Sequence, residues 1–439
     1  VYAQALLRDV PFTEIVDGSG EKVENVVEAL NNLKWFNKEC GLSPAERSRK
    51  RKKFVKEDGG GYQTLFRGIT PGDDIGPYIS QFLLVGNKGL GDAHNPKDGY
   101  IAYGSVRIDQ RVRVAKEKDY MTTWDEWFDV QNGADLRGLE KYYGNCEKNP
   151  EYRFITTPRD LATYVHYDAL YEAYLNACLI LLGDKVPFDP GIPFQEPDFL
   201  DHQQGFAHFG GPHILSLVTE VATRALKAVR YQKFNVHRRL RPEALAARLS
   251  LHDKLCVQEL SDMVVAPGLY ELLKLVAEKN LNAANGKKDP RLGDNNYLLP
   301  MAFPEGSPMH PSYGAGHATV AGACVTILKA FFDHGHELGF KDKDGNVVLA
   351  YEPKGEEGEE LAEVKNLSRP LTVEGELNKL ASNIAIGRDW AGVHYFSDYI
   401  ESLRMGEQIA LGILEEQKLT YGENFSMTVP LFDGGSIRI

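Results

Sequence analysis

The sequence predicts a mainly α-helical protein whose core is a bundle of long helices, with minor β-hairpins. Two observations support this fold class. Apolar residues recur at helical spacing in four long segments, and few segments alternate polar and apolar residues as strands do. The composition, 43% hydrophobic and 26% charged, is typical of a globular protein and excludes collagen-like and disordered classes. Long helices of this kind bury their apolar faces by packing together as a bundle.

The chain divides into three regions by pattern. Residues 1–155 are rich in Gly, Asp and aromatic residues and are expected to form short helical or irregular pieces. Residues 156–415 carry the long helices and the candidate site, and residues 416–439 form a C-terminal tail. Because the candidate site draws on distant parts of the helical region, we expect that region to fold as one unit. The chain is therefore expected to be a single domain, with residues 1–155 wrapped against the helical core.

The first long helix is expected from Thr157 to Gly183. Thr157 is a candidate N-cap, with Pro158 at the first helical position and Asp160 at the third. The segment is apolar on more than one face, so it is expected to be buried on several sides. Its Cys178 is expected to be buried like an apolar residue.

Three more long helices are predicted. The second follows Gly211 and Pro212, and the third spans residues 318–332, where Ala and Gly would let neighbouring helices approach closely. The fourth is expected at about residues 394–414. Between the last two lies an insertion, residues 334–371, with a β-hairpin turning at Asp344 and Gly345.

The charge balance limits the partners. A net charge of −12 argues against a nucleic-acid or anionic-membrane surface, so a bound anion would need a local cationic cluster. Apolar runs stay shorter than a membrane span, and the first residues do not resemble a signal peptide. A soluble protein is expected. Its compartment stays open, with secretion and the periplasm as alternatives.

The five cysteines include no C-x-x-C pair, so neither a zinc site nor a complete disulfide framework is indicated.

Three separated segments carry clusters of chemically active residues. K-F-N-V-H-R-R-L-R-P places Lys233 and Arg241 where the second helix is expected to end. In M-H-P-S-Y-G-A-G-H-A-T, Gly314 and Gly316 form a turn at the start of the third helix, where backbone N–H groups bind anions. His317 falls in the first turn of that helix. Each segment alone has a structural explanation, such as a basic helix end.

The third segment, I-G-R-D-W-A-G-V-H-Y-F-S-D-Y, places Arg388 six residues before His394, at the expected start of the last helix. Together the three segments offer fixed cations, backbone donors and two imidazoles at helix ends. This set is suited to binding a tetrahedral oxyanion.

These motifs, in this order, resemble the signature of the vanadium-dependent haloperoxidases, shared in outline with the type-2 phosphatidic acid phosphatase superfamily. The resemblance covers about residues 160–414 and is nearest to the red-algal bromoperoxidases, which have Arg at the place of Arg230 and His at the place of His310. It implies a vanadate cofactor. Hydrogen peroxide, bromide or iodide, and a small organic acceptor would be the substrates, and a homo-oligomer would be the assembly.

Carried over by residue, the resemblance implies that His394 binds vanadium. Lys233, Arg241, Arg388 and the N–H of Gly316 would hold the vanadate oxygens. His317 would act as acid and base, Lys233 would polarise the bound peroxide, and Arg230 and His310 would shape the halide and peroxide side of the pocket. Asp168 resembles a carboxylate that orients a site arginine. The acidic loop at 194–204 resembles a red-algal calcium loop with ligand positions Phe194, Glu196, Asp198, Asp201 and Gln203.

One position departs from the pattern. Ala315 stands where the family usually has Ser, so one hydroxyl donor to a vanadate oxygen is missing. A hydrogen bond to a charged group contributes about 1.5–3 kcal/mol, which predicts roughly ten- to a hundredfold weaker vanadate binding.

Two alternatives remain. The same scaffold could be an acid phosphatase, with His394 as nucleophile and His317 as the leaving-group acid. Because Ala315 removes a donor, the protein could also be a low-activity or non-catalytic oxyanion-binding protein.

Overall fold

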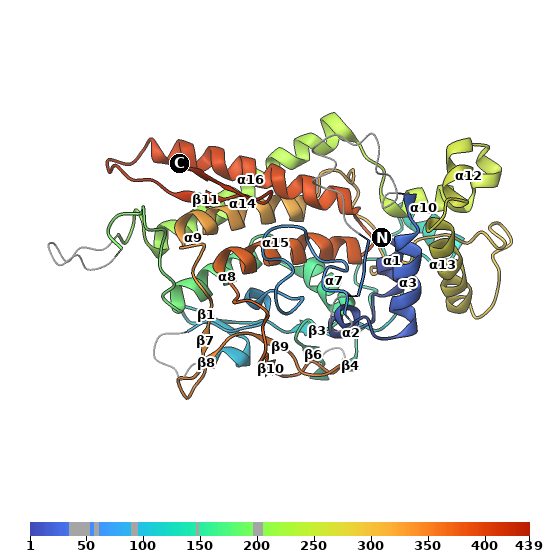
Figure 1. Cartoon of the computed structure of the whole chain (residues 1–439). Coiled ribbons are helices and arrows are strands. Elements are labelled where there is room, and N and C mark those ends of the chain that lie inside the picture. Colours follow the sequence, from blue (N-terminus) through green and yellow to red (C-terminus); the bar gives the residue numbers. More distant parts are fainter. Residues whose placement is uncertain (35–52, 57–60, 89–94, 146–148, 196–204) are drawn as a thin grey trace.

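The computed structural model describes residues 1–34, 53–56, 61–88, 95–145, 149–195 and 205–439. Its centre is helix α14 (Gly316–Phe331), whose side chains are buried along almost its whole length. Helices α9 (Gly211–Tyr231), α15 (Val373–Trp390) and α16 (Phe396–Lys418) pack around it. In Figure 1, α16 runs above α14, and α15 lies below it. The predicted bundle of long helices is confirmed.

The predicted first helix is two helices. Helix α7 (Pro158–Tyr167) begins with the predicted capping box, in which the Thr157 hydroxyl and the Asp160 carboxylate each accept a backbone N–H. The chain leaves the helical conformation at Asp168, which has ψ 139°, and helix α8 (Glu172–Gly183) follows. The apolar periodicity continues across the break, so periodicity alone could not reveal it. Helix α8 is buried on most sides, as predicted, and Cys178 and Cys324 are buried.

Helix α15 was not predicted, because its buried face carries polar residues that interrupt an apolar pattern. Glu376, Asn378, Lys379 and Asn383 are all buried there. Each is hydrogen-bonded by a neighbouring segment; for example, the Asn383 side chain accepts the Ser80 N–H at 2.8 Å. Helices between the first and second motifs were also not predicted; they are α10 (Pro242–Ser250), α11 (His252–Leu255), α12 (Gln258–Val264) and α13 (Leu269–Ala283).

The N-terminal region consists of short elements packed on the bundle. Helices α1 (Tyr2–Leu6) and α3 (Glu21–Asn31) contact α13, and the 3-10 helix η1 (Gln81–Leu83) contacts α8 and α15. Buried Arg8 donates to the Trp390 carbonyl at 2.8 Å and to the Pro300 carbonyl at 2.8 Å, which ties this region to the C-terminal end of α15. Its helices are α1 (Tyr2–Leu6), α2 (Phe12–Asp17), α3 (Glu21–Asn31), η1 (Gln81–Leu83), η2 (Pro96–Asp98) and α6 (Trp124–Gln131).

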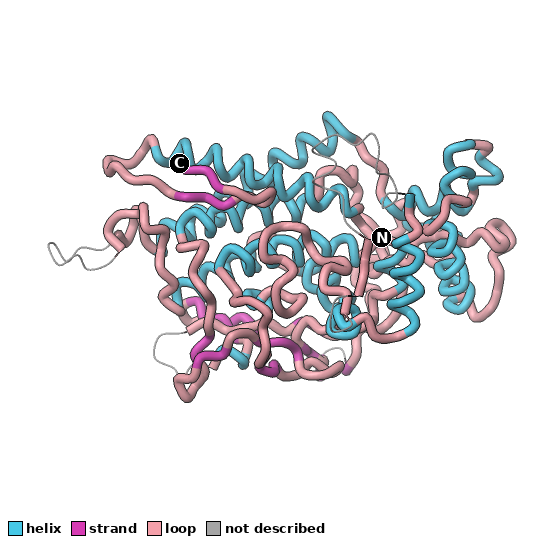
Figure 2. The backbone as a smooth tube through the Cα atoms, viewed as in Figure 1, coloured by secondary structure: helices cyan, strands magenta, loops and turns pink. Residues whose placement is uncertain are grey.

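Within the described residues the strands form six separate two-stranded antiparallel sheets, most of them on one side of the helices (Figure 2). The predicted hairpin at Asp344 and Gly345 is confirmed as the β7–β8 pair, in which Phe340 faces Val348. The strand pairs are β1 (Tyr100–Tyr103) with β2 (Val106–Asp109), β3 (Val112–Arg113) with β6 (Tyr152–Arg153), β4 (Gly144–Asn145) with β5 (Asn149–Pro150), β7 (Phe340–Lys341) with β8 (Val347–Val348), β9 (Tyr351–Pro353) with β10 (Leu361–Glu363), and β11 (Thr428–Pro430) with β12 (Ser436–Arg438).

In the part of the chain that the structure describes, each helix is too short or too polar to cross a bilayer.

Candidate active site

The three motifs meet where four helix ends converge. Helix α9 continues into a π-helical turn, η3 (Gln232–His237), which carries Lys233. Helix α14 begins at Gly316, so His317 lies in its first turn. Arg388 lies in the last turn of α15, and His394 precedes α16, whose N-cap is Tyr395. The last helix therefore starts slightly later than expected, but His394 still lies at its N-terminal end.

Lys233 is 1% exposed, and its ammonium group donates to two backbone carbonyls of the second motif, Pro311 O at 2.8 Å and Ser312 O at 3.1 Å. These bonds fix the amine against the turn that precedes α14. Burial, with Arg241 nearby, lowers the pKa of Lys233 to about 7. The amine lacks a carboxylate partner among its described hydrogen bonds, so an anion would stabilise its charge.

Arg241 connects the first motif to the other two. Its guanidinium donates to the carbonyls of His310 at 2.8 Å and Val393 at 2.6 Å. The same group lies 2.9 Å from His310 Nδ1 and 3.2 Å from His394 Nε2. Because arginine can only donate, both ring nitrogens act as acceptors. Burial and the neighbouring Lys233 lower the pKa of His310 to about 4, which is consistent with a neutral ring.

His394 is buried and oriented by Asp398, one helical turn later. Its Nδ1 lies 3.1 Å from Asp398 Oδ2, so Nδ1 carries the proton and Nε2 keeps its lone pair. Asp398 also accepts the Ser312 hydroxyl, and Arg239 donates to it at 2.7 Å. Burial raises the pKa of Asp398, but the bonds from His394 and Ser312 outweigh it and lower the pKa to about 2.

The sequence predicted no role for three residues of this site, Asp398, Ser312 and Arg239. The signal that could have found Asp398 is its spacing: a carboxylate four residues after a histidine at a helix start lies over that histidine. Ser312 and Arg239 are brought to Asp398 by the fold, and a local pattern could not place them.

Arg388 is a buried cation with unused donors. One terminal nitrogen donates to the Val165 carbonyl at 2.8 Å, while Nε is buried and has no hydrogen-bond partner among the described residues. Burial lowers the pKa of Arg388, and the negative charges of Asp168 and Glu305 oppose that shift. A guanidinium held in this way is prepared to bind an anion.

His317 and Asp168 form a pair that was not predicted from the sequence. His317 Nε2 lies 3.0 Å from Asp168 Oδ1, whereas the expectation placed this carboxylate against an arginine. The break between α7 and α8 aims Asp168 at the first turn of α14. The charge of Asp168 still acts on Arg388, so one carboxylate serves both groups.

The start of α14 offers free backbone donors. Ala315 is its N-cap and provides no side-chain hydrogen bond to the helix, and its own N–H donates to Ser402 Oγ at 2.8 Å. The N–H groups of the first turn therefore have no side-chain cap, and together with the helix dipole they favour an anion.

Two predicted groups lie apart from this centre or outside the described residues. Arg230 is exposed, its guanidinium 5.5 Å from the Phe234 ring centroid, and its charge contributes to the lowered pKa of His310. In the predicted calcium loop only Phe194 is described, and its carbonyl accepts the Gly205 N–H at 3.0 Å. The other expected ligands, Glu196, Asp198, Asp201 and Gln203, lie outside the described residues.

A cavity of about 980 Å³ opens beside Arg241 and His310. Its wall also includes Glu305, Met309 and the basic residues Arg137, Arg238 and Arg239. Its position gives small molecules an approach to the cationic centre from the side of His310.

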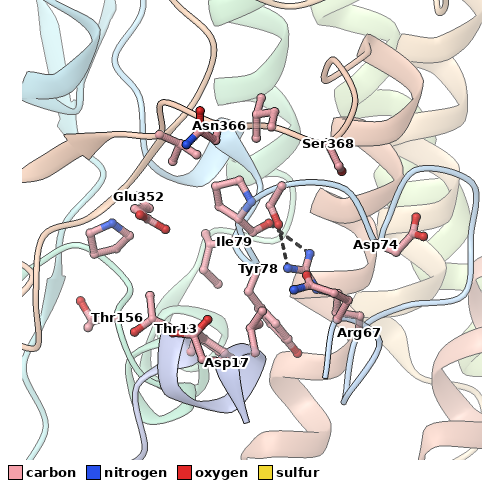
Figure 3. Close-up of a pocket in the computed structure, with 18 of the residues that line it drawn as sticks. Thr13, Asp17, Arg67, Asp74, Tyr78, Ile79, Thr156, Glu352, Asn366 and Ser368 are labelled. Atoms are coloured by element: carbon pink, nitrogen blue, oxygen red, sulfur yellow. Dashed lines mark hydrogen bonds between the residues drawn. The ribbon is translucent and has the colours of Figure 1, made fainter. Parts of the chain in front are cut away.

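A second cavity, of about 590 Å³, is separate from this centre, because its lining includes no motif residue (Figure 3). Side chains of both charges face it, including Asp17, Arg67 and Glu352. Proximity to Asp17 adds to burial in raising the pKa of Glu352. We assign the chemistry to the cationic centre, because in the described part of the chain only this centre brings together buried cations, uncapped amides and imidazoles.

The donor set fits an oxyanion that carries a metal. Lys233, Arg241 and Arg388 supply buried N–H donors, while Asp398 holds the Nδ1 proton of His394, so that Nε2, 3.2 Å from Arg241, keeps its lone pair. An imidazole lone pair can bind a metal in place of that hydrogen bond, and the surrounding donors suit negatively charged oxygens. Carboxylates gathered to bind a bare cation are absent: among the described residues, no cluster of three or more His, Cys, Asp or Glu side chains could hold a metal ion.

Comparison with known proteins gives consistent results. A family model described as the VCPO second helical-bundle domain matches residues 272–420. Vanadium-dependent bromoperoxidases from Corallina pilulifera and Corallina officinalis are 50% and 49% identical, each over all of this chain and 73% of the relative. One from Ascophyllum nodosum is 32% identical over all of this chain and 70% of the relative.

The structural comparison agrees with the sequence comparison. The homohexameric structure of the second vanadate-dependent bromoperoxidase from Ascophyllum nodosum matches with a TM-score of 0.72 and 28% identity, covering all of this chain and 69% of that one. Fold and site thus define an oxyanion-binding helical bundle with a histidine placed to bind a metal. With half of its residues identical over its full length to a curated relative, the chain belongs to the vanadium-dependent bromoperoxidase family.

Proposed function

We propose that this chain is a vanadate-dependent haloperoxidase that uses hydrogen peroxide to oxidise bromide, and iodide more easily, to hypohalous acid, which then halogenates a small organic acceptor. The observation that carries this proposal is the arrangement around His394. Its Nε2 lone pair, fixed by Asp398, lies among three buried cations, with Arg241 at 3.2 Å. Family membership supports the same reaction.

Each residue has a proposed role. His394 Nε2 would hold the vanadium, and Lys233, Arg241 and Arg388, with the N–H of Gly316, would hold the oxygens. Bound vanadate would supply a Lewis acid that polarises peroxide oxygen. His317, with Nε2 on Asp168, keeps Nδ1 for proton exchange with substrate. His310 and Arg230 would shape the entrance for peroxide and halide.

The direct test is bromination of a phenolic dye by the vanadate-loaded protein with peroxide and bromide, using the vanadate-free protein as control. We expect activity only with vanadate, and a His394→Ala variant should lose both vanadium content and activity. Full vanadium occupancy without bromination, together with hydrolysis of a phosphate ester, would favour the phosphatase alternative. A His394→Ala variant that kept its vanadium would contradict the ligand assignment.

We also propose that the chain forms a homo-oligomer, as the Ascophyllum relative does. Large apolar side chains are exposed near the site: Tyr231, Phe234 and Val236 on η3 and its approach, and Met309, which is 97% exposed. Exposed apolar groups gathered in this way mark protein interfaces. Light scattering should give a mass above one chain, and Val236→Glu should reduce it. A monomer at all concentrations would contradict the proposal.

A further inference from the structure

A second histidine–carboxylate pair lies near the site, outside the three motifs. His166, at the end of α7, has Nε2 2.6 Å from Glu305 Oε1. Its other ring nitrogen, Nδ1, faces Glu140 Oε2 at 3.5 Å, slightly beyond hydrogen-bond distance. The ring stacks on Phe303 with centroids 3.7 Å apart and planes at 17°, which fixes its orientation. Each ring nitrogen of His166 therefore faces a carboxylate.

The two carboxylates lie on opposite sides of the imidazole. Glu305 lines the 980 Å³ cavity that Arg241 and His310 also line. Its Oε2 is buried and has no hydrogen-bond partner in the described part of the chain. The Glu140 oxygen that faces Nδ1 also accepts the Tyr142 hydroxyl and, at 2.9 Å, the Tyr167 hydroxyl, and Tyr167 is 58% exposed. The imidazole thus connects the site cavity to a partly exposed tyrosine.

The charges around His166 favour its protonated form. Burial lowers the pKa of its ring, but the two neighbouring carboxylates, Glu140 and Glu305, outweigh burial and raise it above the ordinary value. His166 in turn lowers the pKa of Glu305 against the effect of burial. The titratable and charged groups that face this cluster are Glu140 and Tyr142 from the preceding loop, Tyr167 from α7, Glu305 from the cavity wall, Tyr120 from the N-terminal region, and Arg137 and Arg388, whose charges act on Glu305.

The proposed reaction needs a proton source. When peroxide oxidises a halide, the O–O bond breaks and an oxygen–halogen bond forms; the halide loses two electrons, and the peroxide oxygens gain them. Hydrogen peroxide, halide and one proton thus yield hypohalous acid and water. A fixed acid with a pKa near the working pH supplies that proton more readily than rare hydronium ions do.

We propose that Glu140, His166 and Glu305 form a proton relay for this site, a role that rests on the proposed haloperoxidase function. A proton enters His166 at Nδ1 from the Glu140 side, the Nε2 proton passes to Glu305, and Glu305 releases it into the cavity beside Arg241 and His310. The His317–Asp168 pair remains the acid–base pair in the pocket itself. The relay would supply protons to the cavity separately from that pair.

The competing explanation is structural: the bond between His166 and Glu305 could simply hold the loop after Phe303 on α7. The two explanations differ in what a small buffer acid can repair. A lost proton supply can be replaced from solution, because the cavity is large enough for imidazole. A lost structural bond cannot be replaced in this way.

The first measurement uses the vanadate-free protein. With ring-labelled histidine, the NMR titration of His166, assigned by its absence in His166→Gln, should show a pKa above the ordinary histidine value. Glu305→Gln should lower that pKa. An unchanged His166 titration in Glu305→Gln would overturn the pair as a proton-carrying unit, whatever the protein's activity.

The second measurement uses the vanadate-loaded protein. Glu305→Gln and His166→Gln should bind vanadate with unchanged affinity but lower kcat for bromide oxidation about a hundredfold at neutral pH, the lower end of what a positioned acid contributes. The deficit should shrink toward acid pH, where hydronium becomes abundant, and imidazole buffer should restore part of the rate. The matched control is His213→Gln, which removes a half-buried histidine bonded to the Tyr421 hydroxyl at 2.5 Å, away from the site.

The outcomes are distinct. Wild-type kcat and pH profile in both variants would overturn the relay. The relay would also be overturned if the variants lost vanadate affinity in proportion to their activity and imidazole buffer restored none of the rate. In that case His166 and Glu305 would act by holding the pocket around Arg388. If the wild-type protein itself fails to brominate, the proposed function fails, while the NMR result still reports on the pair.

Discussion

The imidazole of His394 depends on a residue outside the vanadate pocket. Asp398 accepts from Nδ1 and is itself held by Ser312 and Arg239, so the ring cannot easily change its tautomer. Groups that orient a metal-binding histidine usually matter nearly as much as the ligand. Asp398 is therefore the residue we would change first.

Asp398→Asn should weaken vanadate binding about ten- to a hundredfold, because an amide can donate to Nδ1 and so leave the proton on Nε2. The measurement is an equilibrium vanadate titration. Asp433→Asn is the matched control, since it removes a carboxylate from an exposed pair with Arg404. Equal affinities in Asp398→Asn and the wild type would show that Asp398 does not set the tautomer.

Lys233 makes the vanadate-free protein less stable near neutral pH. The unfolded chain keeps this lysine charged up to about pH 10.5, whereas the folded protein keeps it charged only below about pH 7. The folded state binds fewer protons between these values, so the destabilisation is complete below pH 7 and disappears as the pH rises to 10.5.

Lys233→Met should therefore raise the free energy of unfolding of the vanadate-free protein at pH 6.5, by roughly 1–4 kcal/mol after allowing for its two lost hydrogen bonds. The gain should fade toward pH 10. Denaturant unfolding at several pH values measures this, with Lys227→Met, an exposed position on α9, as control. A Lys233→Met protein that was less stable at pH 6.5 would contradict the inferred burial penalty.

Ala315→Ser should have two effects, one on the stability of α14 and one on vanadate affinity. A serine N-cap stabilises a helix by about 1 kcal/mol relative to alanine, and α14 now lacks a side-chain cap. The same hydroxyl could donate to a vanadate oxygen, which predicts about ten- to a hundredfold tighter vanadate binding. Thermal unfolding and vanadate titration measure the two effects separately. An unchanged vanadate affinity would show that cations and amides already satisfy the oxygens.

At the scale of elements, the contact between α14 and α16 depends on two glycines. A Cβ on Gly322 would lie 2.2 Å from the Leu403 carbonyl oxygen, and one on Gly406 would lie 2.1 Å from the Thr319 carbonyl oxygen. Neither backbone can move away without separating the helices. The sequence predicted this close approach from the small residues of the third helix.

Gly322→Ala should destabilise the protein by about 1–3 kcal/mol or more, through overpacking. Gly412→Ala on α16 is the matched control, because a Cβ there meets nothing within 4 Å. That change should stabilise by up to about 1 kcal/mol, through helix propensity. Denaturant unfolding measures both, and similar effects at the two positions would contradict the packing argument.

Much of the architecture could be predicted from local patterns, because caps, apolar periodicity and glycines act over a few residues. The Thr157 capping box and the hairpin at Gly345 are examples. The course of α15 could not be predicted, since its buried polar side chains are satisfied by segments such as Ser80, distant in sequence. Nor could the partner of Asp168, which depends on where the chain turns after α7. The motif residues could be named, but their hydrogen bonds required the fold.

At the scale of the whole molecule, we propose that the chain folds as one unit, as the sequence suggested. Buried polar contacts join the N-terminal region to α15: Gln81 N–H donates to Glu376 at 2.8 Å, and Arg8 donates to the Trp390 carbonyl. Leaving either donor buried without its acceptor would cost about 1–3 kcal/mol. Separate unfolding of the two regions would therefore be unfavourable.

Calorimetry of the vanadate-free protein should show one cooperative transition, with equal calorimetric and van't Hoff enthalpies per cooperative unit. Vanadate at a hundred times its Kd should stabilise the folded state by about 2.7 kcal/mol and shift the whole transition upward. Two resolved transitions, of which only one moved with vanadate, would show that the N-terminal region and the helical core unfold independently.

The interruption between α7 and α8 is what makes the Val165 carbonyl available. In an unbroken helix, the Ala169 N–H would occupy that carbonyl; here it donates instead to Glu172 Oε2 at 3.0 Å, and Arg388 takes the vacated acceptor at 2.8 Å. A glutamate with no direct part in the chemistry thus decides whether a pocket arginine has an anchor. Substitutions chosen to make residues 158–183 a more regular helix would strengthen that segment and, by the same hydrogen bond, release the arginine from its place.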